Sequence, residues 1–563
     1  MQKTYLINHY KENLNFPKNS KIVFRNEYLF FLYKHKILKR YKCSFVENLN
    51  TVYNKNKDQN FIKIKLKKYR NYLSKSLNKI HNVYFSKYEW GILLDYYLIV
   101  SIFIINLKLR NFKKIKNRKI FCKVLNKEFF FLDTKAFHDE IFLNNDLNKY
   151  IDYLVLNGLG FKNLKKINNK NKKDNKIVKK SSFGDKISYF FLKIITKFST
   201  ISIISSGYFG LKNSLILFFF SKFKIFFLNS NFFRLSDGIF LFKSKRRNHL
   251  MIPEDDIFDK IFNQYNKNVF PSSFFENFEK FYRYEDDICK KIKNLGSAVL
   301  FLESDIYRFF AMKIKRRGGK LINFQHGGLN RMRKFSLEEF FVDRYADLDF
   351  WWHDKNGIGV PYFDNHKPKY KNNDEILFFP TINLYQETTV NLKKCNHINL
   401  NQYWKFFELM KNCLKDKVKI KLMHHKNSDS LKRIWEKRYN KNIILNKKNY
   451  KGSVFKNFKI VIIDNYSTPL FELLYISHPF IIINDSKLIE YNKDFREIVQ
   501  KLNEIGVLFK SEIQAAQFIN SNYQNIDLWW KKIIKKKQFR QIKKKLYPKE
   551  KFDYQKLFYK LEK

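Results

Sequence analysis

Short apolar segments alternate with helix-length segments through the second half of this 563-residue chain. This alternation limits the possible folds more than any other feature, because it is typical of βαβ units that build a parallel sheet. Residues 460–463 (Ile-Val-Ile-Ile) resemble a strand that is buried on both faces. We predict strands at 298–302, 320–324, 375–380, 419–423, 459–463 and 479–483, and helices at 305–317, 400–414, 428–439 and 469–476.

The chain is too long for one hydrophobic core, so we expect more than one domain. The pattern predicts one sheet before and one after about residue 362, in domains that span 1–361 and 362–526 and enclose a cleft. Residues 84–109 predict a buried helix, and residues 527–563 predict basic helices that complete the fold. Residues 162–182 are mainly Lys and Asn, and we expect a disordered or looping insertion there.

The composition is basic and aromatic, with a net charge of +58, 61 Phe and 34 Tyr. This amount of apolar material excludes a disordered chain. The lysine excess accompanies an excess of Asn and Ile, as in proteins from A/T-rich coding sequences, so the charge alone does not identify a partner. The charge would still attract nucleotide sugars or an anionic membrane surface.

The five cysteines are scattered without the spacing of a zinc site or a disulfide framework, which fits a reducing compartment. Residues 1–18 lack the apolar core of a signal peptide. The apolar runs 96–107 and 198–211 are too short to span a bilayer. We therefore expect a cytoplasmic protein, with peripheral attachment to the inner membrane left open.

Residues 321–328 (Leu-Ile-Asn-Phe-Gln-His-Gly-Gly) form a strand-like run that ends in a histidine and two glycines. Ligands of parallel α/β sheets bind at the carboxyl ends of the strands. Gly327 and Gly328 would let the backbone bend there and approach a charged group. His326 could act as acid, base or phosphate partner near neutral pH. The alternative is a glycine turn beside a hydrogen-bonded core histidine.

The strand predicted at 459–463 leads into a hydroxyl-rich turn and an apolar helix. Thr468 suits the N-cap and Pro469 suits the first helical position. The start of this helix would bind an anion beside the hydroxyls of Ser467 and Thr468. Glu472, one turn into the helix, could accept hydrogen bonds from the two hydroxyls of a ribose; a solvated helix glutamate is the alternative.

A third strand-like segment, residues 420–426, ends in His424 and His425. Neighbouring side chains of an extended segment point to opposite sides, so at most one of them faces the ligand edge. We take His425 as a candidate for contact with a phosphate, against the alternative of two surface histidines. Further convergent ligands are absent from the sequence pattern, so we expect no metal site.

In this order, these elements resemble the transferases encoded in O-antigen and other surface-polysaccharide loci of bacteria. That family is distantly related to capsule Kdo transferases and CDP-glycerol glycerophosphotransferases. Residues 465–479 are similar to its Y-N-A-T-T-x-L-E-x-L-A-x-x-x-P stretch, and the resemblance is weaker in the N-terminal part. Leu329-Asn330-Arg331 depart from the aromatic and glycine usual after Gly328. Further matching residues are 77–81, Glu338, Glu339, Asp343, Arg344, Tyr345, Trp351, Trp352, Trp529 and Trp530.

The resemblance implies an α/β, GT-B-like fold, with two Rossmann-like domains facing a cleft and C-terminal helices. The N-terminal domain would take the acceptor, and the C-terminal domain would bind the nucleotide donor. The implied enzyme is a metal-independent glycosyltransferase with no bound cofactor. It would move a sugar from a nucleotide-activated co-substrate to a glycan or lipid-linked precursor of O-antigen or capsule type.

The site residues follow from these elements. The candidate catalytic residue is His326, and Glu472 would hold the ribose. Deprotonation of the acceptor hydroxyl also needs a base. Glu338 and Glu339 are as consistent with a structural role as with a catalytic one. The donor phosphate would contact Gly327, Gly328, Ser467, Thr468 and His425, and the candidate bases are Asp139, Glu140 and Glu89.

Two other functions stay open. A CDP-alcohol phosphotransferase on the same fold would transfer glycerol phosphate, with His326 and His425 flanking the reacting phosphoryl group. A basic nucleic-acid-binding protein is the other alternative. The lysines are spread over the chain and no RNA- or DNA-binding motif is recognised, so we expect no nucleic-acid partner.

Overall fold

The structure, a computed structural model, describes a defined part of the chain. The described residues are 4–7, 17, 19–24, 42–45, 55–113, 120–126, 129–143, 145–161, 164–168, 183–205, 209–228, 230–233, 240–242, 244–328, 331–333, 336–350, 374–380, 400–422, 432, 435–436, 439, 452–484, 491–547 and 553–562.

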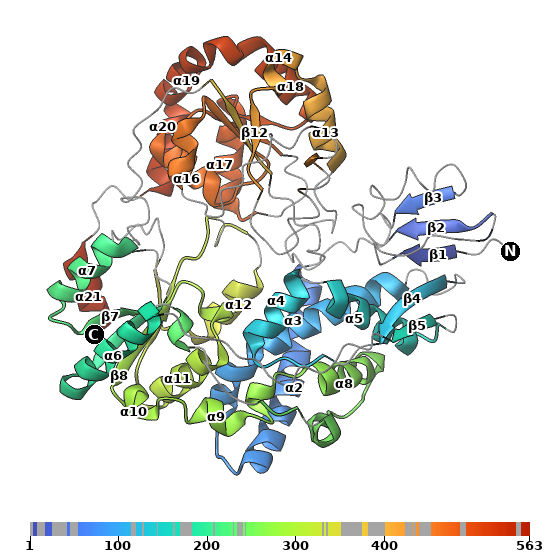
Figure 1. The fold of residues 1–563 in the computed structure, drawn as a ribbon, viewed down its shortest axis with the longest axis vertical. Coiled ribbons are helices and arrows are strands. Elements are labelled where there is room, and N and C mark those ends of the chain that lie inside the picture. Colours follow the sequence, from blue (N-terminus) through green and yellow to red (C-terminus); the bar gives the residue numbers. More distant parts are fainter. Residues whose placement is uncertain are drawn as a thin grey trace.

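A five-stranded parallel sheet lies in the left part of the lower body in Figure 1, with the order β10-β9-β8-β6-β7. Its strands are short, and β9 is buried at every residue. Helices cover both faces of such a sheet, which is why most of the strand residues are buried. The strands are β6 (Ile201–Ser205), β7 (Ile225–Leu228), β8 (Ile292–Ser297), β9 (Leu321–Phe324) and β10 (Leu348–Phe350).

The strand predicted at 298–302 was wrong. Strand β8 ends at Ser297, whose hydroxyl accepts a hydrogen bond from the Val299 N–H at 2.9 Å and turns the backbone. A 3-10 turn, η5 (Leu300–Leu302), follows. The strand itself, Ile-Lys-Asn-Leu-Gly-Ser, contains polar residues that hid it from a search for apolar runs.

The upper body in Figure 1 holds a second five-stranded parallel sheet, with the order β12-β11-β13-β14-β15. The four strands predicted here are confirmed within a few residues, and β15 was not predicted. Both sheets have the same order, since the first strand of each lies between the second and the third. The strands are β11 (Ile376–Phe379), β12 (Val418–Ile420), β13 (Ile460–Ile463), β14 (Phe480–Ile483) and β15 (Leu508–Phe509).

These two sheets give the predicted α/β fold, with two Rossmann-like units and C-terminal helices, consistent with a GT-B-like arrangement. The division predicted near residue 362 lies outside the described residues, as does most of the helix predicted at 428–439.

A third parallel sheet, β3-β2-β1-β4-β5, was not predicted. Its last strand lies inside the segment for which we expected a disordered or looping insertion. That expectation was wrong for residues 164–168, which pair with β4 along their whole length, and residues 169–182 lie outside the described residues. The strands are β1 (Thr4–Ile7), β2 (Lys21–Phe24), β3 (Lys42–Phe45), β4 (Ile120–Asn126) and β5 (Leu164–Asn168).

The buried helix predicted at 84–109 is confirmed as α3 (Lys87–Lys113). It is long and apolar enough to cross a membrane by length and composition, and no other helix of the described residues is. However, 94% of its apolar window is buried in the protein, as expected for the core helix of a globular domain. The run 96–107 judged from sequence is therefore the centre of a longer apolar helix.

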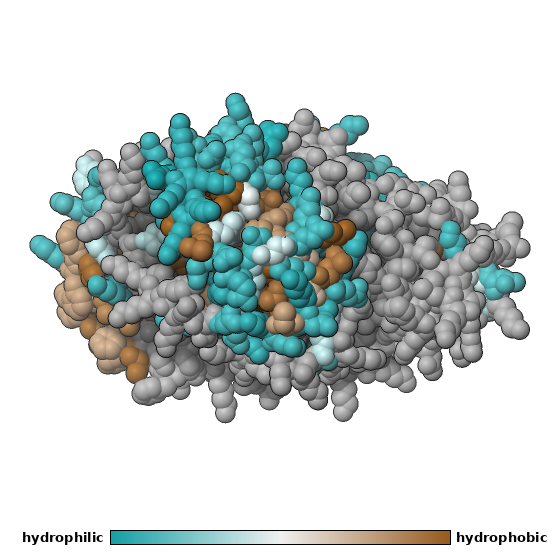
Figure 2. Space-filling view, turned by 90° about the horizontal axis from the view of Figure 1, so that it is seen from above, coloured by the Kyte–Doolittle hydropathy of each residue, from teal (hydrophilic) through white to brown (hydrophobic). Residues whose placement is uncertain are grey.

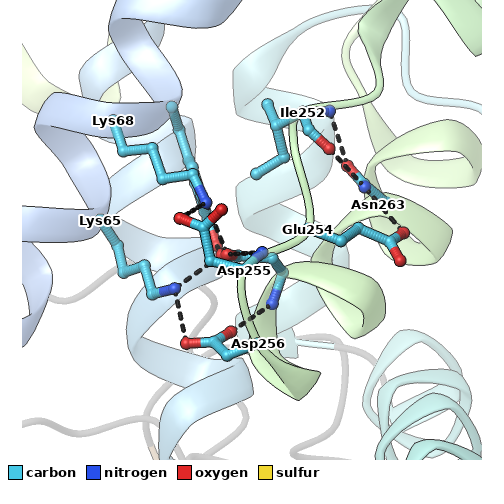
Figure 3. A network of polar contacts seen from close by, with 9 residues as sticks. Lys65, Lys68, Ile252, Glu254, Asp255, Asp256 and Asn263 are labelled. Carbon is cyan, nitrogen blue, oxygen red and sulfur yellow. Dashed lines mark hydrogen bonds and ion pairs between the residues drawn. The ribbon is translucent and has the colours of Figure 1, made fainter.

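A network of charges fixes α2 (Lys55–His81), which packs along α3, against α8 (Ile257–Val269). Figure 3 shows Lys65 and Lys68 reaching from α2 toward the acidic residues at the start of α8. Their amines lie 2.7 and 2.6 Å from the carboxylate of Asp259, which is fully buried. Asp256, the N-cap of α8, also accepts a hydrogen bond from Lys65 at 2.9 Å. Each carboxylate therefore has a cationic partner, and the network is structural.

The remaining helices surround the sheets (Figure 1). Those of the N-terminal half are α4 (Thr134–Leu143), α5 (Asn145–Gly158), α6 (Phe183–Phe198), α7 (Gly210–Phe220), α9 (Phe278–Tyr282), α10 (Asp286–Lys290), α11 (Asp305–Arg316) and α12 (Leu337–Tyr345). Those of the C-terminal half are α13 (Leu400–Leu409), α14 (Asn412–Lys415), α16 (Thr468–Ile476), α17 (Lys493–Glu504) and α18 (Glu512–Asn522).

The predicted C-terminal helices are confirmed as α19 (Ile526–Lys535), α20 (Lys537–Leu546) and α21 (Tyr554–Glu562). The first two pack on the upper body, where Trp530 contacts Phe480 with ring centroids 5.3 Å apart. Helix α21 returns to the lower body, where Asn294 of β8 donates to the Leu561 carbonyl at 2.7 Å. The end of the chain therefore ties the two bodies together.

Candidate functional site

The carboxyl edges of the two similar sheets meet at the loop after β9 and the start of α16. The Gly328 N–H donates to the Thr468 hydroxyl at 3.3 Å. A Cβ atom on Gly328 would lie 2.5 Å from Cε2 of Phe471, closer still to Cδ2, and 3.1 Å from the Thr468 backbone nitrogen. Only glycine allows this approach. The same atom on Gly327 would find its nearest neighbour, Thr468 Oγ1, at an ordinary 3.8 Å.

Two further contacts join the bodies next to this loop. Asn492, the N-cap of α17, donates its backbone N–H to the Met332 carbonyl at 2.9 Å. Arg333 forms an antiparallel bridge with Tyr491. One hydrophobic cluster also includes Phe324 of the lower sheet and Phe471 of the upper body. The loop after β9 therefore lies in a packed interface.

Helix α16 begins one residue earlier than predicted. Its N-cap is Ser467 rather than Thr468, with Pro469 in the first turn, and no side chain makes the cap hydrogen bond. Asn465 instead accepts from the Ser467 N–H at 3.0 Å and shapes the turn. The Thr468 hydroxyl is used by Gly328 across the interface. Both hydroxyls thus lie at the positive end of α16, where an anion is stabilised.

His326 lies at this interface with a second histidine that the sequence patterns did not single out. Burial lowers the pKa of His326 to about 4, so the imidazole is neutral at pH 7. His138 of α4 hydrogen-bonds the Tyr96 hydroxyl at 2.6 Å. Burial, together with the nearby charges of Lys135, Arg308 and His326, lowers the pKa of His138 to about 3. The two imidazoles are therefore close enough to interact electrostatically.

Cation and carboxylate side chains complete this polar cluster. The buried Arg308 guanidinium of α11 lies over the rings of Tyr96 and Phe341, 5.3 and 5.1 Å from their centroids. Glu338 lies one turn before Phe341 on α12. Burial raises the pKa of Glu338 to about 7, against the lowering effect of Arg333. A carboxyl group with this pKa can exchange a proton near neutral pH.

The structure separates the three predicted base candidates. Asp139, on α4, is close enough to Tyr96 to influence its pKa, and Glu140 follows it, with both side chains half-buried. Glu89 instead accepts from the Ser86 N–H at 2.6 Å and pairs with Arg316 Nε at 2.5 Å. Arg316 ends α11, at the amino edge of the sheet, so Glu89 is not brought to the site.

The remaining predicted residues differ in accessibility. Glu472 is only 1% exposed, and its carboxylate is close enough to Tyr547 to raise the pKa of that phenol beyond the effect of burial. A ribose could reach this carboxylate only with movement of its neighbours. His425 lies outside the described residues. Among the residues that the structure does describe, no group of three His, Cys, Asp or Glu side chains could hold a metal ion.

Sequence reasoning missed His138, Arg308 and Tyr96, and it did not assign Glu338 to the site. His138 precedes the flagged Asp139, which was the only local signal. The others come from α3, α11 and α12, and only the packing of these helices brings them together.

A search of curated proteins gives no match to this chain. In contrast, residues 8–552 match the family described as LIC12162 family transferase. The match includes both similar sheets, the loop after β9 and the start of α16. The chain is thus a transferase of the LIC12162 family.

Proposed function

We propose that this transferase moves a sugar from a nucleotide-activated donor to a surface-polysaccharide precursor of O-antigen or capsule type. One observation carries the proposal: the loop with His326 contacts the positive end of α16 through Gly328 and Thr468. This contact combines an imidazole with a helix start that favours phosphate, at the carboxyl edges of two parallel sheets.

The donor phosphate binds at the start of α16, near the hydroxyls of Ser467 and Thr468. The neutral imidazole of His326 donates a hydrogen bond to the leaving phosphate rather than a full charge, because its pKa is about 4. Arg308 and Arg333 add positive charge around the phosphate. Glu472 binds the ribose after a local rearrangement, since its side chain is buried.

Glu338 is the base that accepts the proton of the acceptor hydroxyl, because its pKa of about 7 leaves it partly ionised at neutral pH. The acceptor oxygen forms a bond to the anomeric carbon as the bond from that carbon to the donor phosphate breaks. The nucleotide leaves with the electron pair. Asp139 of the neighbouring α4 is the second candidate for this role.

A panel of CMP-, UDP-, GDP- and CDP-linked donors in a thermal-shift screen tests the donor class, since a bound donor raises the melting temperature. Intact-mass analysis of the product then tests the chemistry. We expect a sugar increment; a glycerol-phosphate increment would instead identify a CDP-alcohol phosphotransferase.

Two substitutions test the site itself. His326→Ala and Glu472→Ala should each abolish transfer while the protein stays folded. His249→Ala, at an exposed histidine of the 3-10 helix η3 (Ser244–Leu250), is the matched control and should keep full activity. Normal product formation by the purified His326→Ala variant would remove His326 from the mechanism.

A further inference from the structure

The large exposed apolar side chains of the described residues concentrate on α6, α7 and the turn after α7. In Figure 2 a brown area lies at the left end of the molecule, where Figure 1 places α7. Phe198 and Leu211 are 83% and 79% exposed, against the few percent of a core side chain. Together we call these side chains the α6–α7 surface: Ile187, Phe190, Phe191, Ile194, Phe198, Leu211, Leu215, Ile216, Phe219, Phe220 and Phe223.

Helix α7 packs on the edge strand β7, and α6 packs on the 3-10 turn η2 (Ser230–Phe233) that follows it, so the surface lies at one end of the lower sheet. Phe218 of α7 contacts Phe226 of β7, with ring centroids 5.7 Å apart. Tyr189 of α6 contacts Phe232, just after β7, at 6.0 Å. The inward faces of α7 and α6 therefore pack on β7 and on the turn after it, and the apolar residues of the α6–α7 surface lie outside these packed faces.

The spacing on α6 shows that the outward face is a continuous stripe. Ile187, Phe190, Phe191, Ile194 and Phe198 recur at intervals of three and four residues, which places them on one side of the helix. A soluble helix normally carries polar side chains on that side. Exposed apolar patches of this kind mark contact with a protein or a membrane.

The positive charge around the α6–α7 surface favours an anionic membrane over a second copy of the chain as the partner. Residues 186–224 contain six lysines and no acidic residue. Lys193, Lys197, Lys212 and Lys222 are exposed beside the apolar side chains. A second copy of the chain on this surface would bring like charges together, whereas an anionic phospholipid layer offers both apolar chains and negative headgroups.

The length of α7 determines how it would lie in the lipid. Its 11 residues span only about 16 Å, roughly half the hydrocarbon thickness of a bilayer. The helix can therefore lie in the interface but cannot cross the membrane. Its start is close to the candidate site, because Phe209 contacts Phe324, two residues before His326, with ring centroids 5.3 Å apart.

We propose that the α6–α7 surface docks this protein on an anionic phospholipid membrane, with the Phe, Leu and Ile side chains inserted among the acyl chains. The lysines contact the headgroups. This inference goes beyond the proposed sugar transfer and does not depend on it. A membrane contact near His326 would also present a lipid-linked acceptor at a fixed distance from the site.

Co-sedimentation with vesicles tests the proposal on the full chain. We expect binding to vesicles of phosphatidylcholine with phosphatidylglycerol, weaker binding to phosphatidylcholine alone, and a decrease with salt. The double variant Phe190→Asp/Phe219→Asp should bind at least about tenfold more weakly, because two large apolar side chains leave the lipid. Lys212→Glu/Lys222→Glu should lose the preference for the anionic vesicles.

The matched control is Leu528→Asp on α19, a side chain that is 59% exposed on the upper body. It should bind vesicles as the natural protein does. The proposal would be overturned if the natural protein did not bind anionic vesicles, or if the Phe190→Asp/Phe219→Asp variant bound them as the natural protein does. It would also be overturned if these substitutions dissolved a dimer in sedimentation equilibrium and left vesicle binding unchanged.

Discussion

Substitution of Gly328 by alanine tests the contact between the two bodies at the level of one methyl group. Neither Gly327 nor Gly328 is among the described glycines with positive φ, which are Gly160, Gly210, Gly318 and Gly506. The backbone at both positions therefore tolerates alanine, and only the surroundings differ. At Gly328 the new Cβ meets Phe471 at 2.5 Å or less, whereas at Gly327 the nearest atom is 3.8 Å away.

The loss of stability expected for Gly328→Ala follows from these different surroundings of the two Cβ atoms. Carbon atoms pack best at about 3.5–4.0 Å, so relief of the contact needs a shift of more than about 1 Å. Phe471 is buried and belongs to the cluster that spans both bodies, so it cannot simply turn away. Overpacking of this kind costs about 1–3 kcal/mol. Alanine also makes the unfolded chain less flexible, which stabilises both variants by a similar few tenths of a kcal/mol, up to about 1 kcal/mol.

The pair Gly328→Ala and Gly327→Ala therefore isolates the steric cost. Thermal or denaturant unfolding should show Gly328→Ala about 1–3 kcal/mol less stable than Gly327→Ala. A shift of about 1 Å between the His326 loop and α16 should also reduce transfer by about 100-fold. The added substitution Phe471→Leu should restore part of both losses. Equal stability and equal activity of the two alanine variants would refute the proposed contact.

Three further predictions concern ionisable groups. Glu338→Gln should abolish most transfer, by about 10²–10⁴-fold, yet should unfold at a higher temperature than the natural protein at about pH 8. Burial raises the pKa of Glu338 to about 7, so its ionisation above that pH opposes folding; a destabilised Glu338→Gln variant would contradict this. The rate of transfer should rise with pH through an apparent pKa near 7. The neighbouring control variant, Glu339→Gln, should keep this pH dependence. A rate of the natural protein that does not change with pH would exclude Glu338 as the base. Asp259→Asn should lower the free energy of unfolding in denaturant by about 3 kcal/mol. Burial alone would raise the pKa of Asp259, but the hydrogen bonds from Lys65, Lys68 and Tyr69 lower this pKa to about 2. The destabilisation should therefore be complete above about pH 4 and vanish as the pH falls through about 2, and a destabilisation that does not depend on pH would contradict the prediction.

The elements predicted correctly are those whose signal is local. Residues 460–463 form a buried strand because four branched aliphatic side chains fit only a core, and residues 305–316 form a helix that Ser304 caps. The N-terminal sheet was missed because α2 and α3 separate β3 from β4 in the sequence, and because β5 (Leu-Lys-Lys-Ile-Asn) has two adjacent lysines and no apolar run. Such strands are stabilised by pairing, which no short window of sequence contains.

In the candidate site, too, the residues with a local sequence signal were predicted and those brought together by packing were not. The sequence patterns singled out the loop after β9 and the start of α16, since glycines and hydroxyls after apolar strands are typical of ligand edges. The steric need for Gly328 could not be predicted, because it depends on Phe471 from the other body. Glu338 and His138 converge through the packing of α12 and α4 around α3, and their pKa values result from burial.

A crystal structure with a hydrolysis-resistant nucleotide sugar bound would show where the donor phosphate lies. We expect the donor phosphate within hydrogen-bond distance of both the 326–328 loop and the start of α16 at Ser467 and Thr468. A phosphate bound away from that contact, with His326 and α16 unengaged, would contradict this expectation.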